Sequence, residues 1–545
     1  MLVFHQKNTN KALLKNYNYQ HFTSTYIIAS LHLDKLQAQM KKILYFLLLF
    51  FIISNTIFAQ SIDDSFSQKK MRKDLEVFKK IRTTANSGLY KYRTSQEIDS
   101  IYNWADSQID KSSTYRDFFN IISELTDFEG SLHNGTSIPN KVLQNLRKEE
   151  SGYFPLPIKW IEGKWVVNFK NGEIPLGAEI ISVNGIPMTY LMYELGKYYT
   201  TDGKNITGKR LGIRTHFAKY FRLKNGLQDN FKIVFKEKNA NKSKEVIFIS
   251  VSYAKYYERV NKRHSRPFDQ IYYAHLDKNE KYSFKLIDSF SGILKLNSFA
   301  IGDESTSEHK EYAKFLDSVF NKIKKNNLKN LIVDIRINGG GDDPNDVITY
   351  SYLTQRKFQE NIQAWISFKK IPLLKYYNIG IPKFIRPFVA GKYNRKLQEI
   401  FPLEKKGKYY QDENSNDHKV RLPSEKAFNQ KVYLLISPAV ASSASLFGSM
   451  VAGNDNTITI GEETMGGYYG HNSHTPLEYK LPKSKIVTRF SIVNLEQDVQ
   501  KKDNQLYNRG IIPDIEINQT YQDYLTQKDT QMNFVLDLIK KNSSE

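Results

Sequence analysis

The pattern of apolar and polar positions is clearest over residues 431–474, where a strand, a turn and a helix follow one another. The continuous apolar run Lys431–Ile436 predicts a buried strand. Small residues follow, and the apolar residues between 446 and 451 then recur at helical spacing, so a helix is predicted to begin near Ser443. A serine at that bend lies at the positive end of the helix dipole, where backbone N–H groups stabilise negative charge. The position suits a nucleophile, although a serine at a helix start more often serves as its cap.

A second unit of the same kind occupies residues 331–354. Leu331–Ile335 predicts a buried strand, Asn338–Gly341 is a turn with three consecutive glycines, and Pro344 suits the first turn of a helix. Glycines at such a turn let the backbone approach a ligand and direct N–H groups toward it. If the two strands are neighbours in one α/β layer, the glycine turn lies beside the start of the Ser443 helix. That arrangement has the outline of an oxyanion hole.

The rest of the chain divides by its pattern into regions of different character. Helical periodicity dominates residues 61–126, and alternating β-rich runs separated by turns follow over residues 153–252. The predicted regions are an N-terminal helical domain at 60–152, a β-rich domain at 153–255, a charged aromatic connector at 256–285, and a catalytic domain at 286–545 with an insertion at 357–430. The insertion is expected to pack on its own domain. Covering the site, or contact with a membrane surface, is the alternative.

Residues 40–59 have the pattern of a secretory signal peptide. Met40 and two lysines precede eleven apolar residues, and the small residue Ala59 follows. The apolar run is short for a transmembrane helix. Because the signal starts at an internal methionine, residues 1–39 are interpreted as an upstream extension that the natural protein lacks. We therefore expect export to the periplasm or the extracellular space, with a retained membrane anchor as the alternative.

Length, charge and cysteine content exclude several classes of function for this chain. A chain of 545 residues is too long for one hydrophobic core, so several domains are expected. The formal net charge of +22 favours anionic substrates or surfaces, but we find no RNA-recognition signature, zinc-finger spacing or phosphate loop and expect no nucleic-acid partner. The absence of cysteine excludes disulfides, thiolate metal sites and cysteine nucleophiles.

Residues 175–185, PLGAEIISVNG, resemble the hallmark "GD-x-I-x-x-x-NG" stretch of PDZ domains. The resemblance extends over about a hundred β-rich residues. It implies that this region takes up peptide C-termini by adding a strand to a sheet edge. A β-rich scaffold without a ligand is the alternative.

Four further stretches, in order, resemble the motifs of the C-terminal processing peptidases, also called tail-specific or tricorn-like serine peptidases. They are VDIRINGGG, ASSASLF, TIGEETMGG and RGIIPDIEI. The resemblance implies an α/β fold with a crotonase- and Clp-protease-like catalytic core, preceded by the N-terminal helical segment and the β-rich PDZ-like domain. It also implies a serine-type peptidase that hydrolyses polypeptides through an acyl-enzyme without a metal or an organic cofactor. The substrate's C-terminus is one candidate point of recognition, and the oligomeric state is left open.

The resemblance assigns roles to individual residues. Ser443 aligns with the nucleophile and Ala444 with the residue that supplies one oxyanion N–H. Gly339 and Gly340 of the glycine turn would supply the other. One branch of the family places a lysine base in "T-F-G-K-G", but this chain reads TMGGY at 464–468 and has no lysine there.

The tricorn-like branch uses a histidine as general base, and SLHN at 131–134 resembles the element that carries it. His133 is therefore the expected base, with His471 and His474 as alternatives. A supporting carboxylate is not assigned. Its candidates are Glu462, Glu463, Glu496 and Asp503. Two other functions stay open: a catalytically silent envelope protein that binds peptides, and a hydrolase or isomerase that performs other acyl chemistry on the same core.

Overall fold

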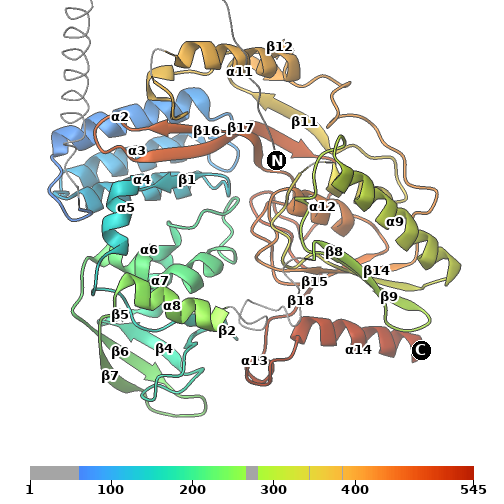
Figure 1. The fold of residues 1–545 in the computed structure, drawn as a ribbon, viewed down its shortest axis with the longest axis horizontal. Helices are drawn as coiled ribbons and strands as arrows, with labels where there is room; N and C mark the ends of the chain where they lie inside the picture. Colours follow the sequence, from blue (N-terminus) through green and yellow to red (C-terminus); the bar gives the residue numbers. More distant parts are fainter. Residues whose placement is uncertain (1–60, 265–279, 343, 383–384, 545) are drawn as a thin grey trace, which may run out of the picture. The chain divides into compact units, whose positions relative to one another are not determined.

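The computed structural model describes residues 61–264, 280–342, 344–382 and 385–544 (Figure 1). The predicted signal peptide, the segment upstream of it and part of the predicted connector lie outside the described residues. Within those ranges, no helix is both long enough and apolar enough to span a membrane.

One sheet contains both predicted strand–turn–helix units. Its strand order is β18-β15-β14-β10-β9-β8, and all neighbours are parallel except the β8–β9 pair. The strands are β8 Tyr282–Leu286, β9 Ser291–Leu296, β10 Asn330–Asp334, β14 Lys431–Ile436, β15 Thr457–Gly461 and β18 Ile515–Glu516. In the register of the central pair, Leu331 lies opposite Val432 and Asp334 opposite Leu435.

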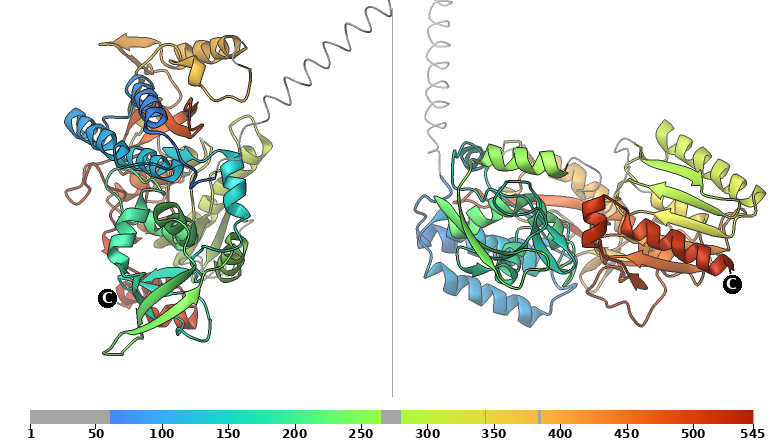
Figure 2. Two further views of the ribbon diagram at one scale, coloured as in Figure 1. Left: turned by 90° about the vertical axis from the view of Figure 1, so that its left-hand side faces the viewer. Right: turned by 90° about the horizontal axis from the view of Figure 1, so that it is seen from below.

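Both faces of this sheet are buried, which explains why its central strands are continuous apolar runs. Leu331 and Val333 belong to one core, whereas the intervening Ile332 belongs to another. The first core includes the helices α9 Ser307–Lys325, α10 Asn345–Ser351 and α12 Ser443–Ala452. The second core is closed by α14 Thr530–Ser544, which runs along the other face (Figure 2).

The turns after β10 and β14 meet at one edge of the sheet, because parallel neighbours carry their carboxyl ends on the same side. The glycine turn therefore lies beside the start of α12, as the sequence predicts. The helix itself begins at Ser443, directly after the bend residue Ser442.

A second sheet has the order β1-β17-β11-β13-β12, with β16 also paired to β17. Its strands are β1 Gly135–Ser137, β11 Asn361–Ile366, β12 Leu403–Lys405, β13 Lys408–Tyr410, β16 Asn472–Lys480 and β17 Val487–Gln497. Three N-terminal helices share its core: α2 Gln68–Ala85, α3 Ser95–Ile109 and α4 Tyr115–Phe128 (Figure 1). The predicted insertion contributes β11, β12, β13 and α11 Arg386–Ile400, and it joins this sheet through the β11–β17 pair.

A third, antiparallel sheet occupies the region predicted to be β-rich. Its order is β2-β3-β4-β6-β7, with β5 on β4. The strands are β2 Ile158–Ile161, β3 Lys164–Val167, β4 Glu179–Val183, β5 Ile186–Pro187, β6 Asn230–Lys236 and β7 Lys244–Ile249. Three helices, absent from the sequence prediction, pack with it: α6 Met188–Gly196, α7 Lys209–Asn225 and α8 Tyr253–His264. The remaining elements are α5 Asn140–Arg147, α13 Tyr521–Thr526 and the short 3₁₀ helix Leu374–Tyr376.

Candidate active site

Ser442 occupies a strained bend between β14 and α12. Its backbone has φ 55° and ψ −135°, a region that non-glycine residues rarely adopt and that typically costs about 1–3 kcal/mol. The turn around it is held by the Ala444 N–H, which donates to Ala441 O over 3.1 Å, and by the Ser445 N–H, which donates to Ser442 O over 2.9 Å. A strained serine that the surrounding structure holds in place is typical of a functional position.

His133 approaches this serine from a loop between α4 and β1. Its Nε2 lies 3.4 Å from Ser442 Oγ. The neighbouring Ser443 is different: it is 4% exposed, and its Oγ has no hydrogen-bond partner among the described residues. The structure therefore brings His133 to Ser442 rather than to the predicted Ser443. The reason is that α12 begins at Ser443, which encloses that side chain and leaves Ser442 as the partly exposed bend residue.

The environment of His133 keeps its imidazole neutral. Burial, aided by Coulomb interactions with His474 and Arg489, lowers the pKa of His133 to about 4, and the backbone of Asn472 opposes this in part. A neutral imidazole within reach of a hydroxyl can accept its proton at neutral pH. Within the described residues, no carboxylate bonds to this ring.

The glycine turn lies against the serine bend. A Cβ on Gly340, whose φ is 101°, would lie 2.8 Å from Ser442 Cβ and 3.1 Å from Ser443 N, so only glycine fits there. The N–H of Gly340 already donates to Asn338 Oδ1, and that of Ala444 to Ala441 O.

Two other N–H groups are better placed to hold an oxyanion. Among the described residues, the N–H groups of Gly339 and Ser443 donate to no acceptor, and open space surrounds the Cβ position of Gly339. Both belong to the turns that meet at the serine bend, and Ser443 opens α12. The predicted glycine turn is therefore in place, but the uncommitted donor after the bend is Ser443 rather than Ala444.

The two alternative histidines lie on or just before β16. His471 is fully buried, both its ring nitrogens lack partners within the described chain, and its ring centroid lies 5.0 Å from that of His133. Burial lowers the pKa of His471 well below its usual value. His474 adopts a φ of 51° at an irregularity in the β16–β17 register. In the described residues, the imidazole that pairs with Ser442 Oγ is that of His133.

Gly467 stands where one branch of the peptidases that the sequence resembles carries a lysine, and this position is closed in this fold. A Cβ on Gly467 would lie 2.9 Å from Gly470 O and 2.9 Å from Tyr92 Oη. The N–H of Gly467 donates to Asp202 Oδ2, and the N–H of Leu132 donates to Asp202 Oδ1, each over 2.9 Å. Asp202 thus fastens the His133 loop to the segment before β16.

Sequence reasoning missed Asp202, because it lies in a polar turn far from either motif. Burial raises the pKa of Asp202 to about 7, which, with its two backbone hydrogen bonds, marks this carboxyl as more than a turn residue.

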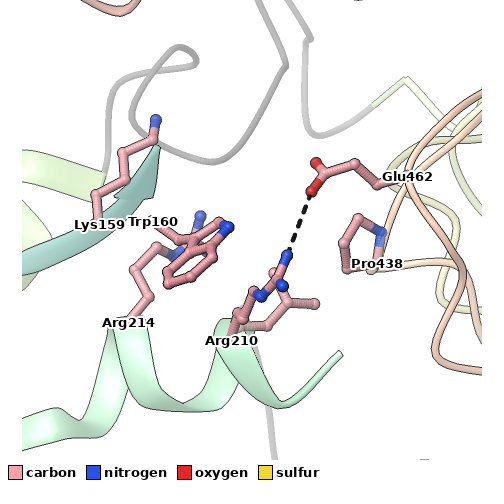
Figure 3. Close-up of a pocket in the computed structure, with 7 residues that line it drawn as sticks. Lys159, Trp160, Arg210, Arg214, Pro438 and Glu462 are labelled. Carbon is pink, nitrogen blue, oxygen red and sulfur yellow. Dashed lines mark ion pairs between the residues drawn. The ribbon is translucent and has the colours of Figure 1, made fainter. Parts of the chain in front are cut away.

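The candidate carboxylates take other partners. Glu463 accepts from Arg509 Nε over 2.7 Å and from the Gly510 N–H over 3.0 Å. Glu462 lies 3.9 Å from Arg210 Nη1 in a small pocket that Trp160 also lines (Figure 3). Burial raises the pKa of Glu462 to about 8. Glu496 lies on β17 and Asp503 in a polar loop, and no hydrogen bond joins any of the four to His133 in the described parts of the chain.

Comparisons with known proteins agree with this architecture. Residues 291–517 match the model of peptidase family S41. No curated protein matches the sequence. The structure of mature CPAF aligns with 87% of this chain and 97% of its own at 14% identity and a TM-score of 0.53. That of mature CPAF complexed with lactacystin aligns with 88% and 98% at 13% identity and a TM-score of 0.52.

At such identities the two structures show a shared fold and nothing finer. The photosystem II D1 C-terminal processing protease aligns with 82% of this chain and 92% of its own, at 12% identity and a TM-score of 0.33. The family match carries the assignment. Residues 291–517 therefore form a peptidase family S41 domain, and the enzyme class that this family gives the domain is that of the serine peptidase hydrolases.

Proposed function

We propose that this protein is an exported serine peptidase that cleaves peptide bonds through an acyl-enzyme on Ser442, with His133 as the general base. The observation that carries the proposal is the 3.4 Å approach of His133 Nε2 to Ser442 Oγ at a strained, partly exposed bend. The nucleophile is thus one residue earlier than the motif comparison placed it. The base is the histidine expected from the sequence.

The geometry supports an ordinary acyl-transfer sequence. His133 takes the proton of Ser442 Oγ as the oxygen attacks the peptide carbonyl carbon, and the imidazolium then gives that proton to the leaving amine. A water molecule, deprotonated by the same imidazole, hydrolyses the acyl-enzyme. A separation of 3.4 Å is long for a hydrogen bond, as is usual before a substrate tightens the site.

Charge that develops on the carbonyl oxygen would be held by the N–H groups of Ser443 and Gly339. Both are uncommitted, and that of Ser443 opens α12, where the helix dipole adds a positive field. Removing one such donor typically costs about 10²–10³ in kcat. Asp202 acts as a positioning residue, because it fixes the loop that presents His133.

We infer a crotonase-like core from the sheet that carries both turns. The β2–β7 sheet is proposed as a PDZ-like module that presents a substrate's C-terminus. The pattern of residues 40–59 supports export to the periplasm or the extracellular space.

The test is hydrolysis of a casein-derived peptide library by the wild type and by Ser442→Ala, His133→Ala and His471→Phe. The first two variants should lose at least about 10³-fold in kcat/KM, while His471→Phe keeps at least about a tenth of the activity. A structure of mature CPAF complexed with lactacystin is known, so this compound is a suitable probe, and we expect it to block hydrolysis by the wild type. Hydrolysis that survives Ser442→Ala would refute the mechanism.

A catalytically silent peptide-binding protein is the second candidate. It is favoured by the lack of a carboxylate on His133 in the described residues and by the closed lysine position at Gly467. If it is correct, the wild type and Ser442→Ala are equally inert in the hydrolysis assay while both bind peptides.

A further inference from the structure

A cavity of about 350 Å³ lies beside β1, the short strand that follows the His133 loop. Its walls come from α4, α5, α7, β1 and the segment after α6. The aromatic part of the wall is built from Phe119, Tyr198 and Tyr220. The rings of Phe119 and Tyr198 stack at 6.3 Å, and those of Tyr198 and Tyr220 lie 5.0 Å apart. None of the residues of the proposed acyl-transfer site lines this cavity.

Two buried polar atoms in the lining have no partner within the described chain. Ser123 is 3% exposed and Asn134 is 6% exposed, and both Ser123 Oγ and Asn134 Oδ1 lack a hydrogen bond. The Asn134 amide is oriented by its Nδ2, which donates to Glu129 Oε2 over 2.8 Å, so Oδ1 is the atom left over. An unpaired buried group of this kind is destabilising unless a ligand satisfies it. The cavity therefore offers one hydroxyl donor and one amide acceptor to a ligand.

The two lysines in the lining differ in their partners. Lys197 lies 3.4 Å from Glu124 and 3.8 Å from Glu194. Lys219 forms no ion pair with any described residue; its Nζ lies 5.4 Å from the centroid of the Tyr220 ring, and the cation Arg147 repels its charge. Burial lowers the pKa of Lys219 to about 8, which leaves it mostly charged at neutral pH. A partly buried ammonium without a counter-charge favours an anionic ligand.

β1 provides a place for an extended chain. It is the terminal strand of its sheet, paired to β17 on one side and to no described strand on the other. Gly135, Thr136 and Ser137 all line the cavity, and a Cβ on Gly135 would meet no atom within 4 Å. A free edge of this kind accepts an added strand from a peptide.

We propose that this cavity binds the acidic side chain of a polypeptide that lies along the free edge of β1. The carboxylate accepts hydrogen bonds from Lys219 Nζ and Ser123 Oγ, and a peptide N–H donates to Asn134 Oδ1. The excess of lysine and arginine over aspartate and glutamate along the chain attracts such peptides over a longer range. This inference rests on the proposed function only in naming the bound chain a substrate, since binding itself needs no hydrolysis.

The test is fluorescence anisotropy on the full chain carrying Ser442→Ala, with labelled peptides that differ only by Glu or Gln at one position. We expect the Glu peptide to bind at least about tenfold more tightly, and Lys219→Met to remove that preference. Lys310→Met, the same change at an exposed position on α9, is the matched control and should leave the preference intact. Equal binding of the two peptides, or a preference that survives Lys219→Met, would overturn the proposal.

Two further arms complete the test. Ser123→Ala should weaken binding of the Glu peptide about three- to tenfold. It should not lower the protein's melting temperature, because the hydroxyl has no partner among the described residues of the unliganded protein. A loss of stability without a loss of affinity would contradict the assigned role. Free glutarate should compete only at concentrations at least a hundredfold above the peptide's. Competition at equal concentration would show that the ligand is a free carboxylate and overturn the polypeptide assignment.

Discussion

Two polar clusters lie at the same edge of the parallel sheet, and they differ in how fully their groups are satisfied. Arg336 follows β10 and donates to Asp334 from Nε and Nη2 over 2.9 and 2.8 Å, and to Asp529 from Nη1 and Nη2 over 2.7 and 2.8 Å. Ser442 follows β14, has strained backbone angles, and meets His133 over 3.4 Å.

The difference separates a structural cluster from a reactive one. Arg336 ties β10 to α14 with ideal paired geometry, and Coulomb attraction to Asp334 and Asp529 raises its pKa despite burial. Around Ser442, by contrast, Ser443 Oγ and both nitrogens of His471 are buried without partners in the described chain. A protein keeps strain and unpaired polar groups where they serve function.

The largest expected effect is on the satisfied cluster. Arg336→Met would leave Asp334 and Asp529 without their common partner, and breaking a buried ion pair in this way costs about 3–5 kcal/mol. Urea denaturation measures the free energy of unfolding. The matched variant Ser442→Ala, at the same sheet edge, should change it by less than about 0.5 kcal/mol. Equal destabilisation by both variants would erase the distinction between the clusters.

The second effect concerns the pH dependence of the reactive cluster. The pKa of His133 is lowered from 6.5 to about 4 in the folded protein. The unfolded chain therefore binds a proton on this ring below about pH 6.5, while the folded protein does so only near pH 4, so stability falls as pH drops through that window. The loss from this group is at most about 3 kcal/mol.

The pH dependence of the activity should follow protonation of the same imidazole, that of His133. The neutral base persists to low pH, so kcat/KM should hold its plateau down to about pH 5 and fall near pH 4. Replacing His133 by Phe should flatten the stability loss between pH 6.5 and 4. An acidic limb of activity near pH 6.5 would show that His133 is not held in its neutral form.

The smallest effect isolates the backbone strain. Ser442→Gly should raise the free energy of unfolding by about 1 kcal/mol, because glycine adopts φ 55° without strain, and should abolish activity. Ser443→Gly should do the opposite to stability and lower it by about 0.5–1 kcal/mol, because that residue is already helical. Differential scanning calorimetry of the two variants shows whether each substitution raises or lowers the free energy of unfolding. The same sign for both would mean that the bend stores no strain.

The sequence supported much of the architecture and part of the site. Continuous apolar runs predicted the neighbours β10 and β14, and small residues after each predicted the turns that meet. The helix starting at Ser443 was also correct, but periodicity fixes a helix start only to within a residue or two, and ASSASLF offers three serines in four positions. The φ of Ser442, which decides which serine faces His133, is a tertiary property.

Other features had no local signal. The β16–β17 hairpin places His471 beside His133, yet its alternation of residues did not suggest that pairing. Asp202 lies in a turn whose sequence is ordinary, and its function as a clamp depends on contacts with Leu132 and Gly467. Contacts between segments hundreds of residues apart could be expected only through the family resemblance.

The central claim is that Ser442 is the activated serine. The most direct measurement is intact-mass analysis after incubation with a fluorophosphonate probe, on the wild type, Ser442→Ala and Ser443→Ala, with peptide mapping of the labelled site. The account predicts one adduct on the wild type and on Ser443→Ala, located at residue 442, and none on Ser442→Ala. A label that persists on Ser442→Ala and disappears from Ser443→Ala would contradict it and return the nucleophile to Ser443.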